Sequence, residues 1–200
     1  MDLSLKGMRA LVCGSSQGIG KEIAIELANE GVEVLLIARN EEKLNSVLNE
    51  LSKKNNQNHS YIVADFENES DLKNKIEKFT SDNKIKIDIL INNSGGPPPG
   101  KITDAKISDF EKYMKMHLHC SHLLSQLFLP NMKKNRYGRI INIISISVKS
   151  PINNLGVSNT VRWAMASWAK TLSNEVAEYG ITVNNILPGF TMTESCLLYT

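Results

Sequence analysis

Short apolar runs alternate with longer amphipathic stretches along the chain. The first run, Arg9 to Cys13, stops at glycines, and the stretch from Gly18 to Asn29 then repeats its apolar residues at helical spacing. Val32 to Ala38 is apolar almost throughout, which is typical of a strand buried on both faces of a parallel sheet. The alternation therefore predicts an α/β fold built from strand-helix units.

The predicted elements follow one another without an internal repeat or a linker. Strands are expected at 9–13, 32–38, 60–64, 87–91, 139–144 and 182–187. Helices are expected at 18–29, after an N-cap at Asn40, at 70–81, from a capping box of Ser108 and Glu111 toward Pro130, and at 159–179. We expect one doubly wound parallel sheet over residues 1–200, in the order 3-2-1-4-5-6, with ligands at the carboxyl ends of its strands.

Composition narrows the class of protein further. The hydrophobic content of 42% and charged content of 22% suit one globular domain, and the net charge of +2 disfavours nucleic acid as a partner. No signal-peptide pattern and no apolar run near ~18 residues occurs, so a cytoplasmic protein without membrane contact is expected. Cys13, Cys120 and Cys196 lack the spacing of metal ligands, so neither a metal site nor a disulfide framework is expected.

The loop after the first strand is the strongest candidate for a binding site. Gly14, Gly18 and Gly20 allow a tight turn and the close approach of a pyrophosphate to the N–H groups of the next helix. A tight strand-helix turn needs glycine even without a ligand, so the loop alone leaves a purely structural role open. Its place at the head of repeated strand-helix units favours a dinucleotide cradle. The expected cradle comprises Gly14, Ser15, Ser16, Gln17, Gly18, Ile19 and Gly20.

The G-x-x-x-G-x-G spacing of this loop resembles the short-chain dehydrogenase/reductase family, whose usual version has threonine in place of Cys13. Asn92-Asn93-Ser94-Gly95 is similar to the Asn-Asn-Ala-Gly motif of the family, and Pro188-Gly189 to the pair that its members set beside the nicotinamide. The resemblance covers nearly the whole chain and implies a Rossmann fold. It also implies further cofactor contacts at Asp65, Phe66, Asn92, Ser94, Gly95, Pro188 and Gly189.

The choice between the two nicotinamide cofactors depends on the end of the second strand. NAD-dependent enzymes place an acid there for the ribose 2′-OH, whereas this chain has Ala38 followed by Arg39. Arg39 would meet a 2′-phosphate, so NADP(H) is predicted in preference to NAD(H). The alternative is that Arg39 is simply a surface cation before a helix.

The catalytic positions depart from the family pattern of serine, tyrosine, lysine and asparagine. Matching the surrounding motifs places Ser145 at the serine, Ser158 at the tyrosine and Arg162 at the lysine. His117 falls at the asparagine. A serine hydroxyl lacks the acidity of a phenol and arginine stays protonated, so neither can run the usual proton relay. Arg162 can still bind a cofactor ribose or stabilise an oxyanion.

Two residues could supply the proton in place of the missing tyrosine. His117 has an ordinary pKa of ~6.5, which would make turnover depend on pH through roughly 6 to 7, and Lys149 follows Ser145 in the loop toward the site. The alternatives are a surface or fully hydrogen-bonded histidine and a solvated lysine. The altered set is similar to that of reductase-like members that resemble β-ketoacyl carrier-protein reductases yet lack the standard residues.

Two functional hypotheses follow from the resemblance. One is an NADP(H)-dependent oxidoreductase, similar to 3-oxoacyl reductases, that acts on a small carbonyl or alcohol. The other is a catalytically inactive NADP(H)-binding sensor or regulatory protein. Family members pair through the two long helices, so a homodimer or tetramer is expected, with Trp163 and Trp168 on different faces of the second helix. The chain stops soon after the sixth strand, where family members continue with a helical segment and a seventh strand.

Overall fold

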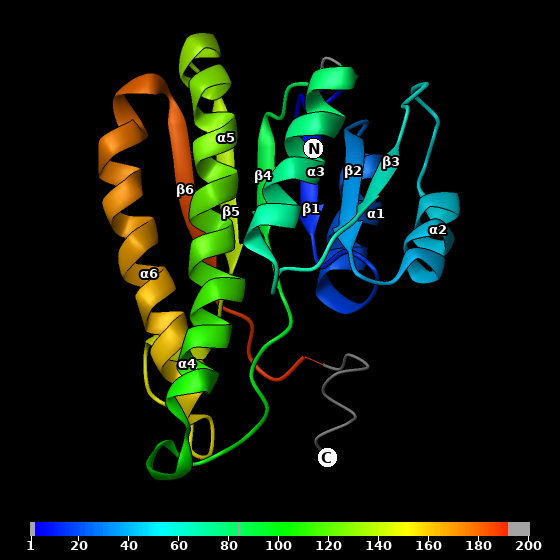
Figure 1. The fold of residues 1–200 in the computed structure, drawn as a ribbon. Helices are drawn as coiled ribbons and strands as arrows, with labels where there is room; N and C mark the ends of the chain where they lie inside the picture. The colour runs from blue at the N-terminus through cyan, green and yellow to red at the C-terminus, as the bar shows by residue number, and fades with distance from the viewer. Residues whose placement is uncertain (1–2, 84, 192–200) are drawn as a thin grey trace.

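Six parallel strands form one sheet in the computed structural model, which describes residues 3–83 and 85–191 (Figure 1). The strand order is β3-β2-β1-β4-β5-β6, as the alternation predicted. The strands are β1 (Arg9–Cys13), β2 (Glu33–Ala38), β3 (Ser60–Val63), β4 (Ile89–Asn92), β5 (Gly138–Ile143) and β6 (Ile181–Ile186). All of them end at the lower edge of the sheet in Figure 1, so the loops that follow them gather there.

Helices connect the strands and form a layer on each face of the sheet. The α-helices are α1 (Gly18–Asn29), α2 (Glu41–Glu50), α3 (Glu69–Asp82), α4 (Ile107–Met114), α5 (Cys120–Asn135) and α6 (Gly156–Val176). A π-helical turn, η2 (Lys115–His119), joins α4 to α5. Short 3-10 turns occur at η1 (Ile102–Asp104), η3 (Ile146–Val148) and η4 (Ala177–Tyr179).

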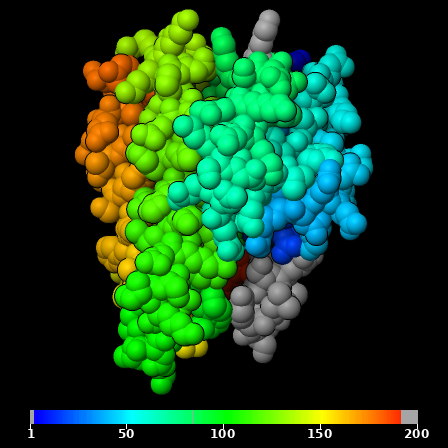
Figure 2. All heavy atoms as spheres, viewed as in Figure 1, coloured from blue at the N-terminus to red at the C-terminus, as the bar shows by residue number. Residues whose placement is uncertain are grey.

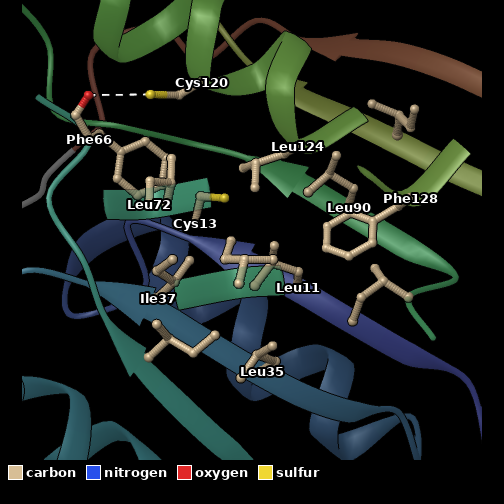
Figure 3. Packing of buried hydrophobic residues seen from close by; sticks show 14 of the residues in the cluster. Leu11, Cys13, Leu35, Ile37, Phe66, Leu72, Leu90, Cys120, Leu124 and Phe128 are labelled. Atoms are coloured by element: carbon tan, nitrogen blue, oxygen red, sulfur yellow. Dashed lines mark hydrogen bonds between the residues drawn. The ribbon is translucent and has the colours of Figure 1, made fainter. Parts of the chain in front are cut away.

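Alternate residues of each strand supply two separate cores. Leu11, Cys13 and Ile37 face one side and pack with α3, α5 and the end of α6 (Figure 3). Val12 and Leu36 face the other side and pack with α1 and α2. Figure 2 shows side chains of α3 to α6 closing over the first face. Each fully buried Leu or Ile contributes about 1.5–3 kcal/mol relative to an exposed one, so the sheet position is fixed from both faces.

One corner of the sheet is covered on a single face by the described residues. Ile141 and Ile143 of β5 belong to the core on the α1 side, and their register partners in β6 are Asn184 and Ile186. Both partners are exposed, and Ile186 keeps 50% of its surface accessible. Between residues 3 and 191, β6 is therefore an edge strand with a bare face on that side.

Two helix boundaries differ from the sequence expectation. The predicted capping box of Ser108 and Glu111 is wrong, because the N-cap of α4 is Lys106, two residues earlier, and the Asp109 carboxylate accepts from the Lys106 backbone N–H. The helix also continues through Pro130 to Asn135. Phe128 and Met132 on one face of α5 are both buried, and this packing offsets the one hydrogen bond that the proline removes.

The last helix also starts earlier than expected, at Gly156 and not at Asn159. The Asn159 side chain instead holds the preceding loop, since its Nδ2 donates to the Ile152 carbonyl oxygen at 2.9 Å. Among the described helices, none has the length and apolar character needed to cross a membrane. No cluster of three or more potential metal ligands occurs in the same residues. Cys13 and Cys120 are buried free thiols, and Cys196 lies outside the described residues.

Candidate active site

The loop between β1 and α1 forms a cradle that depends on its glycines. Gly14 and Gly18 have φ values of 58° and 57°, in the left-handed region that disfavours other residues. At Gly20 a Cβ would lie 2.3 Å from the Gly14 carbonyl oxygen, so only glycine lets the helix pack onto the loop. Gln17 precedes the helix and makes no side-chain capping hydrogen bond. The first N–H groups of α1 therefore remain available to an anion.

A cleft of about 590 Å³ opens beside this cradle at the carboxyl ends of the strands. Most of the residues predicted from the sequence line it. They are Gly14, Ser16, Gln17, Gly18, Ile19, Arg39, Asp65, Phe66, Ser94, Gly95, Ser145, Ser158, Arg162, Pro188 and Gly189. The structure thus brings the cradle, the end of β2 and the altered catalytic positions into one space.

Ser15 and Asn92 lie behind the cleft wall and hold the framework together. The Ser15 hydroxyl is buried and accepts from the Ile37 backbone N–H at 3.0 Å, which ties the loop to β2. The Asn92 amide donates to Asn142 Oδ1 at 2.8 Å, and Asn142 in turn donates to Asn185 Oδ1 at 2.9 Å. This row of amides links β4, β5 and β6 near their carboxyl ends. The geometry therefore does not favour the predicted cofactor contacts of Ser15 and Asn92, because neither residue lines the cleft.

Asn93 lines the cleft, whereas the sequence analysis had predicted this position for Asn92. Its Nδ2 lies 3.2 Å from the carbonyl oxygens of both Cys13 and Gly14, so it fixes the turn of the cradle. Sequence reasoning missed this role, although alternation along a strand places adjacent residues on opposite faces. It also missed several other lining residues. These are Ala38, Asn40, Lys43, Gly96, Met116, Ile143 and Ile144.

Positive charge dominates the part of the cleft beside β2. Arg39 is exposed, and its Nη1 lies 3.8 Å from Glu67 Oε1, which also binds the Lys112 ammonium at 2.8 Å. Lys43, in the first turn of α2, contacts the Gln17 side chain. Lys43 follows the N-cap Asn40 by one helical turn, just after the end of β2. This position could have been predicted from the sequence as a second cation at the cleft. Over the whole cleft, the described lining residues include three cations, Arg39, Lys43 and Arg162, and one carboxylate, that of Asp65.

The catalytic end of the cleft lies across the sheet, beside β5 and α6. Ser158 and Arg162 are one helical turn apart on the same face of α6. The Arg162 Nη1 donates to the Ile143 carbonyl oxygen at 2.8 Å, which places the guanidinium at the end of β5. Burial lowers the pKa of Arg162 to about 10, so the side chain is still charged at neutral pH. Ser145 caps the turn η3, where its hydroxyl accepts from the Ser147 backbone N–H at 3.1 Å.

His117 does not behave as the sequence predicted. It lies in the π-helical turn η2, is only 4% exposed and does not line the main cleft. Its Nδ1 lies 2.8 Å from the Ser94 hydroxyl, which does face the cleft. Burial, and then the charge of Arg162, hold the pKa of His117 well below its usual range. The expected titration between pH 6 and 7 is therefore wrong, because the folded protein keeps this imidazole neutral.

Lys149 is also separate from the cleft. It follows the turn η3, is exposed, and is not among the lining residues. The solvated loop lysine considered as the alternative is the arrangement observed. Neither of the two residues expected to supply a proton thus has direct access to a substrate in this geometry.

The sequence matches a family model described as short chain dehydrogenase over residues 8–196. The chain belongs to the short-chain dehydrogenase/reductase family. It is 36% identical over 190 residues to the 3-oxoacyl-[acyl-carrier-protein] reductase FabG of Rickettsia felis, covering 94% of this chain and 74% of that protein. It is 31% identical over 194 residues to the 7alpha-hydroxysteroid dehydrogenase of Escherichia coli, covering 97% and 75% of the two chains.

Solved structures of the family share the fold of this short-chain dehydrogenase/reductase. L-sorbose reductase from Gluconobacter frateurii, in complex with NADPH and L-sorbose, superposes with a TM-score of 0.90 at 29% identity, covering 98% of this chain and 74% of that one. The 3-ketoacyl-(acyl-carrier-protein) reductase from Brucella melitensis, in complex with NADH, gives 0.87 at 25% identity, covering 98% and 81%. The named relatives are oxidoreductases, and this chain is an oxidoreductase of the same type.

Proposed function

We propose that this short-chain dehydrogenase/reductase uses NADP(H) to interconvert a small carbonyl compound and its alcohol. The observation that carries the proposal is the single cleft in which the cradle, Arg39 and the Ser145, Ser158 and Arg162 cluster meet. A dinucleotide that runs from β2 to β5 would pass every one of these groups. Relatives that bind NADPH or NADH in solved structures support the same cofactor class.

The residues present fit such a cofactor on structural grounds. The cradle has free helix N–H groups and left-handed glycines, which suit a pyrophosphate. A Cβ added at Gly95 would meet no heavy atom within 4 Å, so the middle of the cleft has open space. The excess of cations over acids along the cleft complements a polyanion. Arg39 is placed to meet a 2′-phosphate, and we therefore favour NADP(H) over NAD(H).

The chemistry divides between the cofactor and the chain. When bound, the reduced cofactor supplies a hydride for the carbonyl carbon. The Ser145 and Ser158 hydroxyls would hold the carbonyl oxygen, and the fixed charge of Arg162 would stabilise negative charge that develops nearby. A serine hydroxyl would pass a proton from solvent to the carbonyl oxygen, since the pKa of His117 is held low and Lys149 lies outside the cleft. Lack of a positioned acid costs ~10² to 10⁴ in rate, so slow turnover is expected.

The test is a paired measurement of binding and turnover. NADPH is titrated into the protein, and its oxidation is then followed with a panel of aldehydes, ketones, oxo acids and a 3-oxoacyl thioester. Binding together with oxidation that depends on one class of carbonyl supports the proposal. Binding without oxidation by any carbonyl would favour the sensor hypothesis, and failure to bind either NADPH or NADH would remove both.

Self-association through α6 and the helical segment from α4 to α5 is a separate part of the proposal. Trp163 on α6 is 50% exposed although its indole N–H donates to the Ser147 carbonyl oxygen, so its ring is available to a partner. Trp168 instead packs partly against the core and donates to His122. Ile107 at the start of α4 is 74% exposed. Light scattering at micromolar concentration should show a dimer or tetramer, and a strictly monomeric species would remove this part.

A further inference from the structure

The guanidinium of Arg162 is a mostly buried cation without an acidic partner. Within residues 3–83 and 85–191, the guanidinium makes a single hydrogen bond, from Nη1 to the Ile143 carbonyl oxygen. No carboxylate in the same residues forms an ion pair with it, and its neighbour His117 is neutral. A desolvated charge of this kind is costly unless a counter-charge reaches it. The remaining N–H donors border the cleft and are suited to an anionic ligand.

The position of Arg162 separates it from the places where a dinucleotide carries phosphate. The cradle follows β1 and Arg39 follows β2, whereas Arg162 is fixed to the end of β5. The order of strands is β2-β1-β4-β5, and adjacent strands lie about 4.8 Å apart, so β5 is about 10 Å beyond the cradle. The anion that compensates Arg162 therefore belongs to the substrate end of the cleft.

Small residues leave the guanidinium accessible from the cleft. Ser158 stands one turn before Arg162 with a side chain of two heavy atoms, where a tyrosine ring would fill the space. A Cβ added at Gly96 would lie 3.4 Å from Nη2, so glycine keeps that side of the guanidinium uncovered. The Ser145 and Ser158 hydroxyls line the same part of the cleft. The combination offers a planar cation and two neutral donors at one end of the cavity.

We propose that Arg162 binds a carboxylate of the substrate, and that the substrate is a small oxo acid or the matching hydroxy acid. A guanidinium binds a carboxylate through two parallel hydrogen bonds, which a hydroxyl cannot reproduce. The nearby serine hydroxyls then reach a carbonyl one or two bonds from the carboxylate carbon, as in a 2-oxo or 3-oxo acid. This inference rests on the proposed function, since it names the substrate class for the same cleft.

The test measures binding to the NADPH-loaded protein and so does not depend on turnover. Oxamate and malonamate serve as unreactive analogues of 2-oxo and 3-oxo acids, and their ethyl esters serve as neutral controls. Calorimetry should show that at least one acid binds the wild type about tenfold to a hundredfold more tightly than its ester, the range expected for charge-assisted hydrogen bonds. Arg162→Gln should abolish that difference. Lys149→Gln removes an exposed cation outside the cleft and should leave the difference intact.

Separate readouts distinguish the failure of this inference from failure of the proposed function. In Arg162→Gln the loss of acid preference should exceed any loss of NADPH affinity, whereas a loss of NADPH affinity that is equal or larger would show that Arg162 serves the cofactor. Acids that bind the wild type no better than their esters would also overturn the inference, while NADPH binding leaves the proposed function standing. Arg162→Lys keeps the charge without the planar fork and should retain part of the preference, which provides a test if the glutamine variant does not fold.

Discussion

The Ser94 hydroxyl lies 2.8 Å from Nδ1 of His117 and connects a buried imidazole to the wall of the cleft. The imidazole is held neutral by burial and by the charge of Arg162. It therefore orients the Ser94 hydroxyl and supports the segment that carries Gly95. This geometry favours a positioning role for His117, which is not among the residues that line the main cleft.

The pKa of His117 predicts how stability changes with pH. The unfolded chain gains a proton on this group near pH ~6.5, whereas the folded protein does not until a much lower pH. The unfolded state thus binds more protons below pH 6.5, and the free energy of unfolding should fall there by up to about 1.4 kcal/mol per pH unit from this residue. The contribution should be complete above pH 6.5. Urea unfolding of wild type and His117→Gln between pH 5 and 8 measures it.

The matched control for this experiment is His122→Gln. His122 is exposed on α5, so this variant removes a histidine that lies outside the candidate site. If the free energy of unfolding fell below pH 6.5 as steeply in His117→Gln as in wild type, the low pKa assigned to His117 would be contradicted. In the same account, any change of turnover between pH 6 and 7 should persist in His117→Gln.

Arg39 and Glu67 should set the preference for the phosphorylated cofactor. Arg39→Ala removes the cation placed for a 2′-phosphate and should narrow the NADPH/NADH affinity ratio by about tenfold, the effect of one charge-assisted contact. Glu67→Gln removes the acid that holds Arg39 and Lys112, so it should widen the ratio. Fluorescence titration with both cofactors measures these changes. An unchanged ratio in Arg39→Ala would show that this arginine is not the selector.

Ser15 and Ser16 offer a test of which loop hydroxyl meets the ligand. Ser15→Ala leaves the buried Ile37 N–H without its acceptor and should lower the free energy of unfolding by about 1–3 kcal/mol. Ser16 is half-buried and lines the cleft, so Ser16→Ala should weaken NADPH binding with little loss of stability. Thermal unfolding and cofactor titration of both variants decide the point. If Ser15→Ala instead weakened NADPH binding and Ser16→Ala lowered the stability, Ser15 would be the hydroxyl that meets the ligand.

Restoring the family residues should raise turnover. Ser158 lines a cleft of about 590 Å³, which has room for an aromatic ring. Ser158→Tyr together with Arg162→Lys supplies a phenol beside a lysine and should increase NADPH oxidation with a simple neutral carbonyl by at least about tenfold. Arg162→Lys alone should recover little. Equal rates for the double variant and wild type would show that proton supply does not limit this enzyme.

The fold was predictable because burial imposes a period on the sequence. The continuous apolar run predicts a buried strand at Val32 to Ala38, and the helical spacing of apolar residues predicts a helix at Gly18 to Asn29. The alternation of such strands and helices then predicts the strand order. Local signals at helix ends were weaker. Ser108 is a better N-cap by residue type than Lys106, yet α4 begins after Lys106, whose backbone N–H donates to the Asp109 carboxylate.

The candidate site was predictable where the backbone alone fixes it. The positive φ angles of Gly14 and Gly18 follow from residue type, whereas the burial of His117 does not. That burial depends on a π-helical turn, which rotates the ring toward Ser94 and has no simple sequence signal. The inward direction of Asn92 similarly depends on the row of amides that crosses β5 and β6.

The most direct test of this account is a single-turnover reaction with the protein in excess over NADPH and with a small oxo acid present. NADPH should be consumed in step with formation of the hydroxy acid. Gly14→Ala, which strains the cradle and places a Cβ 2.8 Å from Asn93 Nδ2, should abolish both. Tight binding of NADPH by wild type without any consumption, with oxo acids or with neutral carbonyls, would contradict the account and leave a cofactor-binding protein without turnover.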